Sequence, residues 1–264
     1  MACGRQHDAM LPLKMKHGDV DMKIYAGCIT DRGNYRDKNQ DRVVCRCISR
    51  KQSTLAAACV CDGIGSFEKS ELAAEMVTAG ITHWFEGVRE YYPNVMTEEE
   101  LVEDLDVTIR ELNELVYDFR REKGTDIGCT MSVLLLVNRN YYIFHVGDSR
   151  IYRTKDRLCQ ITRDEVSMGE RDGKIKPLLA NYIGKSRELW LNRFNGSIEG
   201  GELFLMGSDG LYKKLTGEDV AGLGSCIKSN RRAQKACENL LERVLKRGER
   251  DNISCILLNV VSGR

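Results

Sequence analysis

The stretch CVCDGIGSFEKSELAAEM, from Cys59 to Met76, ends an apolar run in an aspartate, continues with Gly-x-Gly and then passes into helical spacing. A strand, a turn and a helix start account for it, because Asp bonds its own backbone and Gly accepts positive φ. The alternative is that Asp62 is a functional carboxylate at a strand end, where sites are often built. The stretch alone leaves both interpretations open, so the rest of the chain has to decide between them.

The segments around this stretch predict a protein rich in strands. Apolar runs bounded by polar turns indicate strands at 22–30, 42–49, 54–61, 129–137, 141–146, 150–154, 158–162, 201–210 and 252–261. Helical spacing predicts helices at 68–91, 97–124, 216–223 and 230–246, the second opened by a capping box of Thr97 and Glu100. The turns between successive strands are too short for crossover helices, so we expect antiparallel sheets covered by helices, an α+β fold.

Composition and charge give no support to a nucleic-acid or membrane partner. The chain has 264 residues and a net charge of +1, from 40 basic and 39 acidic side chains. The first 22 residues lack an apolar core long enough for a signal peptide, and the apolar runs are too short to span a bilayer. Eleven cysteines without a Cys-x-x-Cys pair indicate free thiols in a reducing compartment. We expect a cytoplasmic protein with a flexible tail at 1–22 and a single domain at 23–264.

Five aspartates lie at the ends of predicted strands, and together they favour the interpretation of Asp62 as a functional carboxylate. They are Asp41, Asp62, Asp148, Asp209 and Asp251. Each by itself is an ordinary turn or cap residue. As a group they could supply the oxygen-only, negatively charged cage that hard divalent cations require. Spacing alone does not separate a metal site from a set of surface acids.

Six motifs in order along the chain resemble those of a known family. They are GCITDRGNYRDKNQD, VCDGIGSFEKSELAA, GCTMSVLL, FHVGDSRIY with LCQITRDE, LFLMGSDGLYKKL and RDNISCILL. Together they resemble the PPM-type (protein phosphatase 2C-like) metal-dependent serine/threonine phosphatases in their bacterial form. The resemblance spans about residues 24–260, nearly the whole chain. It implies a four-layer α/β/β/α sandwich, two antiparallel sheets flanked by helices, with a dinuclear Mn²⁺ or Mg²⁺ site at one end.

The resemblance also implies roles for the acidic residues. Asp62 would be the ligand that bridges the two metals, and Gly63 would add a backbone carbonyl ligand. Asp209 and Asp251 would bind the other metal, and Asp41 would act at the same cluster through water or directly. These four aspartates would therefore be both metal ligands and catalytic residues.

Two further residues receive roles from the same resemblance. Arg36 would be catalytic by holding the substrate phosphate, a role that suits a guanidinium because its fork can bond two phosphate oxygens at once. Asp148 would help to bind a weaker third metal. The implied reaction is attack on phosphorus by a water that two metals activate.

The implied function is removal of phosphate from phosphoserine and phosphothreonine proteins, opposing a cognate serine/threonine kinase, by a monomeric signalling enzyme. The alternative is a weakly active or non-catalytic relative that binds phosphoproteins as a regulatory partner. Several positions depart from the family pattern. Gln40 replaces a glutamate, Ile64 replaces a histidine of many eukaryotic relatives, and Glu165 replaces a histidine. The segment after Glu165 is also shorter than usual.

Overall fold

The computed structural model describes residues 22–50, 53–154, 157–171 and 173–262, and its strands form two main antiparallel sheets. The expected tail at 1–22 lies outside the described residues, except for Met22, and so does the centre of the expected turn at 50–53. One sheet has the order β1-β12-β11-β6-β7, and we call it the α6-side sheet. The other has the order β10-β5-β4-β3-β2 and is called the α1-side sheet.

The strands of the α6-side sheet are β1 (Met22–Asp31), β6 (Arg150–Thr154), β7 (Leu158–Gln160), β11 (Glu202–Gly207) and β12 (Ile253–Ser262). Those of the α1-side sheet are β2 (Arg42–Arg50), β3 (Ser53–Cys61), β4 (Met131–Val137), β5 (Asn140–Val146) and β10 (Asn192–Ser197). A separate hairpin consists of β8 (Val166–Arg171) and β9 (Lys174–Leu179). The helices are α1 (Ser70–Val88), α2 (Glu98–Lys123), α3 (Asp209–Tyr212), α4 (Gly217–Val220), α5 (Leu223–Cys226) and α6 (Asn230–Lys246).

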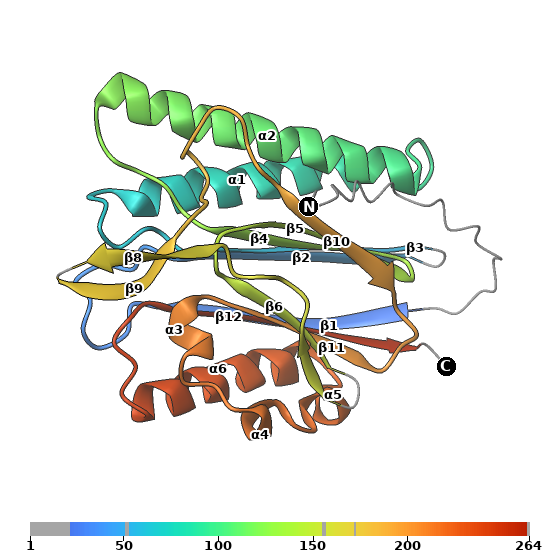
Figure 1. Cartoon of the computed structure of the whole chain (residues 1–264). Coiled ribbons are helices and arrows are strands. Elements are labelled where there is room, and N and C mark those ends of the chain that lie inside the picture. The colour runs from blue at the N-terminus through green and yellow to red at the C-terminus, as the bar shows by residue number, and fades with distance from the viewer. Residues whose placement is uncertain (1–21, 51–52, 155–156, 172, 263–264) are drawn as a thin grey trace, which may run out of the picture.

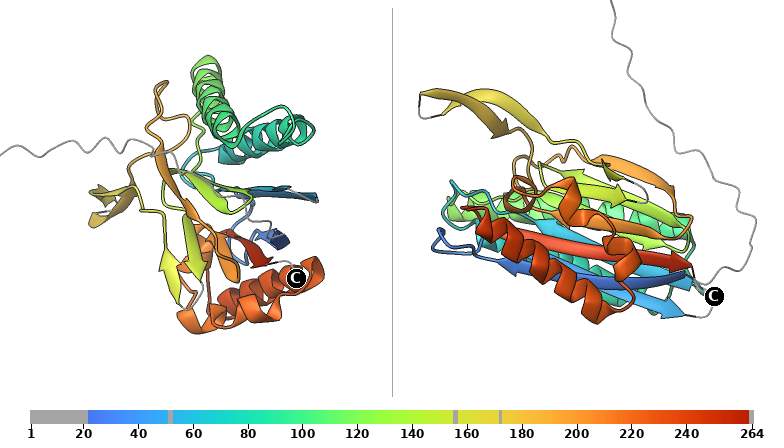
Figure 2. Two further views of the ribbon diagram at one scale, coloured as in Figure 1. Left: turned by 90° about the vertical axis from the view of Figure 1, so that its right-hand side faces the viewer. Right: turned by 90° about the horizontal axis from the view of Figure 1, so that it is seen from below.

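The layers follow the expected order of helices, sheet, sheet and helices. Helices α1 and α2 cover one face, and α6 with the short helices covers the other (Figure 1). The β8–β9 hairpin projects from the body of the sandwich (Figure 2). The antiparallel α+β sandwich predicted from the sequence is therefore confirmed. None of the helices in the described part of the chain is long and apolar enough to cross a membrane.

Three apolar layers hold the sandwich together. In β4, Val133 and Leu135 face the helices α1 and α2, whereas Leu134 and Leu136 face the opposite sheet. Strand β12 shows the same alternation, since Leu258 lies between the sheets and Leu257 packs under α6. These strands are buried on both faces, which explains why their sequences are continuous apolar runs. The core between the sheets thus fixes how the two sheets are placed relative to each other.

The edge strand β1 is closed off by helix α6. The backbone N–H groups of Ala26 and Cys28 donate to the side chains of Asn230 and Gln234, at 3.0 and 3.1 Å. Such side-chain bonds cover edge groups that could otherwise pair with another chain. The helix comes this close because residue 27 is a glycine, and a Cβ there would clash with the backbone of Ala233.

The strands missed in the sequence are the exposed ones. Strands β8 and β9 lie within a stretch that shows no apolar alternation, and every second residue of β10 is exposed. The predicted helix at 216–223 is instead two short helices, α4 and α5, separated by Gly222 in the left-handed conformation. The capping box at Thr97 and the end of α2 at Gly124 are confirmed.

We expect Gly27→Ala to destabilise the fold by about 1–3 kcal/mol, because the added methyl group has to push α6 away from β1. Gly87→Ala is the matched control, since nothing lies within 4 Å of a Cβ at that helical position. Alanine there should be neutral or stabilise by up to about 1 kcal/mol. Urea unfolding of both variants measures the difference. Equal effects of the two substitutions would show that the contact between β1 and α6 is not close-packed.

Candidate metal centre

The five aspartates singled out in the sequence all lie at the same end of the two sheets. Asp41 precedes β2, Asp62 follows β3, and Asp148 lies in the turn from β5 to β6. Asp209 follows β11 as the first residue of α3, and Asp251 comes two residues before β12. Because adjacent strands are antiparallel, the end of one strand lies beside the start of the next. The pairing of Arg42 with Cys61 sets Asp41 and Asp62 side by side in this way.

Burial and mutual repulsion disfavour negative charge in this group. Burial, followed by the charges of Asp41, Asp209, Asp148 and Asp251, raises the pKa of Asp62 well above its ordinary value. Burial raises the pKa of Asp41 to about 6, although Ser254 donates a hydrogen bond of 2.7 Å to its Oδ2. Burial and the charge of Asp209 raise the pKa of Asp148 to about 6. These carboxylates therefore share one electrostatic environment.

Two of the aspartates are bonded to cationic side chains. Among the described residues, no three Asp, Glu, His or Cys side chains converge closely enough to form a metal-binding group. Asp251 accepts two hydrogen bonds from the guanidinium of Arg36, one of 2.9 Å from Nε and one of 2.7 Å from Nη2. Asp209 accepts a bond of 2.5 Å from the ammonium of Lys213. The structure thus places Arg36 beside the aspartates, where it forms an ion pair with Asp251.

The donor set nevertheless fits a divalent cation. One oxygen of Asp41, Oδ1, is buried without a hydrogen-bond partner. Buried polar atoms are rarely left in this state unless an ion or a water completes the site. The surrounding carboxylates supply only oxygen donors, which are the ligands that Mg²⁺ and Mn²⁺ prefer. Charge repulsion of the kind seen at Asp62 is what a bound cation relieves.

Backbone contacts fix the strand ends that carry these residues. The side chain of Asn252 donates to the carbonyl oxygens of Arg32 and Lys38, both at 2.9 Å, and accepts from the N–H of Gln40 at 2.9 Å. It therefore ties the loop that carries Arg36 and Asp41 to the start of β12. Sequence analysis did not find this role, because it joins segments more than 200 residues apart.

Thr130 provides a similar link on the other sheet. Its N–H donates to the carbonyl of Asp62 at 2.8 Å, and its hydroxyl accepts from the N–H of Asp62 at 3.0 Å. The same hydroxyl lies 2.7 Å from that of Ser149, the neighbour of Asp148. Gly63 sits where a Cβ would come within 2.9 Å of atoms of Gln40 and Ser70. Close packing thus gives this glycine a structural role independent of any ligand.

Glu165 connects the exposed hairpin to the turn that carries Asp148. Its carboxylate accepts from the N–H of Gly147 at 2.7 Å and from the side chains of Asn181 and Asn192 at 3.0 and 2.8 Å. Its backbone carbonyl accepts from Ala180, just after β9. Glu165, which departs from the family pattern, therefore connects the ends of β5, β9 and β10 through hydrogen bonds.

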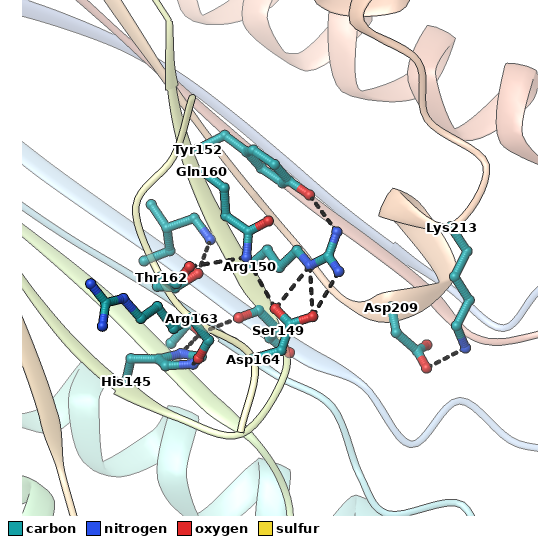
Figure 3. A network of polar contacts seen from close by, with 12 residues as sticks. His145, Ser149, Arg150, Tyr152, Gln160, Thr162, Arg163, Asp164, Asp209 and Lys213 are labelled. Carbon is teal, nitrogen blue, oxygen red and sulfur yellow. Dashed lines mark hydrogen bonds and ion pairs between the residues drawn. The ribbon is translucent and has the colours of Figure 1, made fainter. Parts of the chain in front are cut away.

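A second polar network supports α3, the helix that begins at Asp209 (Figure 3). Arg150 bonds the carboxylate of Asp164 at 2.9 and 2.7 Å, and its guanidinium stacks 3.7 Å from the ring centre of Tyr212. Next to it, His145 is fully buried, with Nδ1 2.8 Å from the hydroxyl of Ser132 and Nε2 3.0 Å from the carbonyl of Arg163. These contacts support a packing role for His145.

We expect Asp148→Asn to stabilise the metal-free protein near neutral pH. The folded-state pKa of Asp148 is about 6, above its ordinary value of 3.8, so the folded protein keeps a proton that the unfolded chain releases in between. The native side chain therefore contributes less stability as pH rises from about 4 to 6. The amide should add up to about 3 kcal/mol above pH 7 and only about 0.5 kcal/mol near pH 4.

Urea unfolding in EDTA at both pH values measures this difference. Glu122→Gln, on the exposed end of α2, is the control for loss of a surface carboxylate. A gain from Asp148→Asn that is the same at both pH values would contradict the electrostatic explanation.

Comparisons with known proteins agree with this fold and with the motifs. The sequence profile of the protein phosphatase 2C family matches residues 36–240. A putative protein phosphatase of Mycoplasma genitalium is 26% identical over 258 residues, which cover 88% of this chain and 94% of that protein. Protein phosphatase PhpP of Streptococcus pneumoniae is 24% identical over 253 residues, which cover 88% of this chain and 96% of that protein.

Solved structures show the same architecture. The catalytic domain of the serine/threonine protein phosphatase PstP, in complex with two manganese ions, superposes with a TM-score of 0.71 at 22% identity. The superposition covers 91% of this chain and 99% of that one. The chain therefore belongs to the protein phosphatase 2C family, the PPM-type serine/threonine protein phosphatases that its sequence motifs resemble.

Proposed function

We propose that this protein is a metal-dependent serine/threonine phosphoprotein phosphatase with a dinuclear Mn²⁺ or Mg²⁺ centre. The observation that carries the proposal is the gathering of five aspartates at one end of the sheets, where burial and repulsion raise the pKa of Asp62 and one oxygen of Asp41 is left without a partner. The two manganese ions in the PstP structure support the choice of metal.

In this proposal the aspartates divide into two groups that would hold the metals. Asp62 would bridge both ions, helped by the carbonyl of Gly63 and by Asp41 close to it. Asp209 and Asp251 would hold the second ion, and Asp148 would contribute to a third, weaker position. When bound, such ions supply Lewis-acid chemistry that makes water acidic enough to attack phosphorus near neutral pH.

Arg36 would bind the phosphate of the substrate. Its side chain is 44% exposed. Its guanidinium lies next to Gly65, so close that a side chain at residue 65 would contact it. The charges of Asp251, Asp209 and Asp62 all act on it. An exposed fork at the rim of the acidic group can exchange its bonds to Asp251 for bonds to two phosphate oxygens. It would orient the phosphorus towards the proposed metal positions and offset negative charge on the oxygens of the phosphoryl group being transferred.

We further propose that residues 23–264 form one catalytic domain, which acts in the cytoplasm as a monomer and opposes a cognate serine/threonine kinase. The family and its named protein phosphatases support a phosphoprotein substrate. Arg36 and Asp251 are partly exposed, so a phosphorylated side chain on another protein could reach this part of the site. Phosphoserine and phosphothreonine peptides are therefore the substrates to test, with p-nitrophenyl phosphate as a general reporter.

We expect Asp62→Ala and Asp209→Ala each to abolish turnover, with a loss of at least about a hundredfold in kcat, because each removes a ligand from a highly charged site. The variants should stay folded, since losing one acid relieves repulsion among the others. Hydrolysis of p-nitrophenyl phosphate in saturating Mn²⁺ is the measurement.

Asp118→Ala, on the exposed surface of α2, is the matched control and should keep normal activity. Near-normal turnover by either site variant would refute the assignment of the metal ligands. An inactive wild-type protein that still binds phosphopeptides would support the non-catalytic alternative.

We expect Arg36→Ala to lower kcat/KM by about ten- to a thousandfold without weakening Mn²⁺ binding, because its fork would contact phosphate and not the ions. Arg36→Lys should recover only part of the rate, since an ammonium cannot form the two-bond contact. Steady-state kinetics and calorimetric titration with Mn²⁺ separate the two effects. Arg32→Ala, in the same exposed loop, is the control. Loss of Mn²⁺ affinity with unchanged kinetics would count against this role.

A further inference from the structure

Lys213 follows Asp209 by one helical turn, and its position is set by the short helix α3. The N–H of Lys213 donates to the carbonyl of Asp209 at 3.0 Å, and Nζ donates to Oδ2 of the same residue at 2.5 Å (Figure 3). Residues four apart on a helix lie on the same face. The ammonium is therefore kept within reach of this carboxylate by four residues of local chain, whatever else the carboxylate binds.

The surroundings of α3 fix the backbone that carries Asp209 and Lys213. Gly210 lies so close to Asn252 that a Cβ would clash with its carbonyl oxygen, which brings the start of α3 against the residue after Asp251. The stacking of Arg150 on Tyr212 holds the end of the helix. Asp209, Asp251 and Glu249 all act on the charge of Lys213. The ammonium thus lies in the field of the two aspartates proposed for one metal.

The two groups of aspartates differ in their internal partners. Asp251 is paired with Arg36 and Asp209 with Lys213. In the described part of the chain, no Lys or Arg forms an ion pair with Asp41 or Asp62. Neutralising cations are therefore built in at one of the two proposed metal positions and not at the other.

We propose that Lys213 is a built-in competitor for the metal position formed by Asp209 and Asp251, so that the two metals bind stepwise and this position fills last. The inference rests on the dinuclear metal function proposed above. A divalent ion at Asp209 either displaces the ammonium from Oδ2 or binds Oδ1 beside it. In both cases the ion bears the repulsion of the ammonium, because the lysine remains tethered one turn away. Its side chain is 50% exposed, so the displaced ammonium can turn towards water.

Removing this charge should tighten the weaker metal position. Lys213→Met keeps most of the length of the side chain and removes the ammonium. We expect the dissociation constant of the weaker Mn²⁺ to fall by about three- to tenfold, the range for partly exposed charge pairs acting on a doubly charged ion. The stronger position should change less, because Lys213 is paired with Asp209 and not with Asp41 or Asp62.

Calorimetric titration of the metal-stripped protein with MnCl₂ tests the proposal without relying on activity. The variants are Lys213→Met, Lys213→Gln and the matched control Lys214→Met, which removes the same charge from an exposed neighbouring side chain. Circular dichroism confirms folding, and the glutamine variant serves if the methionine variant misfolds. Lys213→Arg, which keeps the charge, should not tighten binding.

The outcomes are distinct. Tighter binding at the weaker position in the neutral Lys213 variants alone supports the proposal. Unchanged or weaker binding in these variants, or equal tightening by Lys214→Met, overturns it while leaving the dinuclear centre intact. A wild-type protein that binds no Mn²⁺ overturns both the competition and the proposed function.

Discussion

Repulsion between buried carboxylates is the constraint on which the rest of this site depends. Five aspartates are collected at one end of the sandwich, and the burial of Asp62 and Asp41 makes their negative charge costly. The fold keeps them there through neutral hydrogen bonds on the backbone, such as those of Thr130 and Asn252, and through two cations, Arg36 and Lys213. The free energy gained by packing the apolar layers thus offsets the repulsion among the aspartates.

The two sheets contribute different parts of the site. Asp41 and Asp62 adjoin strands of the α1-side sheet, whereas Asp209 and Asp251 adjoin strands of the α6-side sheet, and Asp148 lies where the chain crosses from one to the other. The spacing between the two groups is therefore set by the core between the sheets, with side chains such as Leu134 and Phe204. The packing of apolar side chains between the sheets therefore controls the distance between the two groups of aspartates that would bind the pair of metals.

The sequence predicted the strands with apolar runs and missed three others, β8, β9 and β10. Strands such as β4 and β12 carry continuous apolar runs, whereas β8–β10 gain their pairing from neighbours and show no apolar face in the sequence. The aspartates could be predicted as site residues because the motifs around them resemble a family pattern. Spacing alone explained them equally well as ordinary turn residues. Asn252, Glu165 and the Arg36–Asp251 pair could not be found, since they depend on contacts between distant segments. Lys213 was within reach of prediction from its spacing of four after Asp209.

The order of strands has a consequence for how the protein is made. Strand β12, the last strand described, lies between β1 and β11 in its sheet, and Asp251 comes two residues before it. A ribosome releases β1 more than 200 residues before its partner emerges, so β1 has to wait through the synthesis of that intervening chain without its hydrogen-bonding neighbour. Such long-range pairing slows folding. A nascent chain that stops short of residue 251 would carry Asp41, Asp62, Asp148 and Asp209 but not Asp251, and β1 would lack the strand that joins it to β11. The group of five aspartates is therefore completed only when β12 is made.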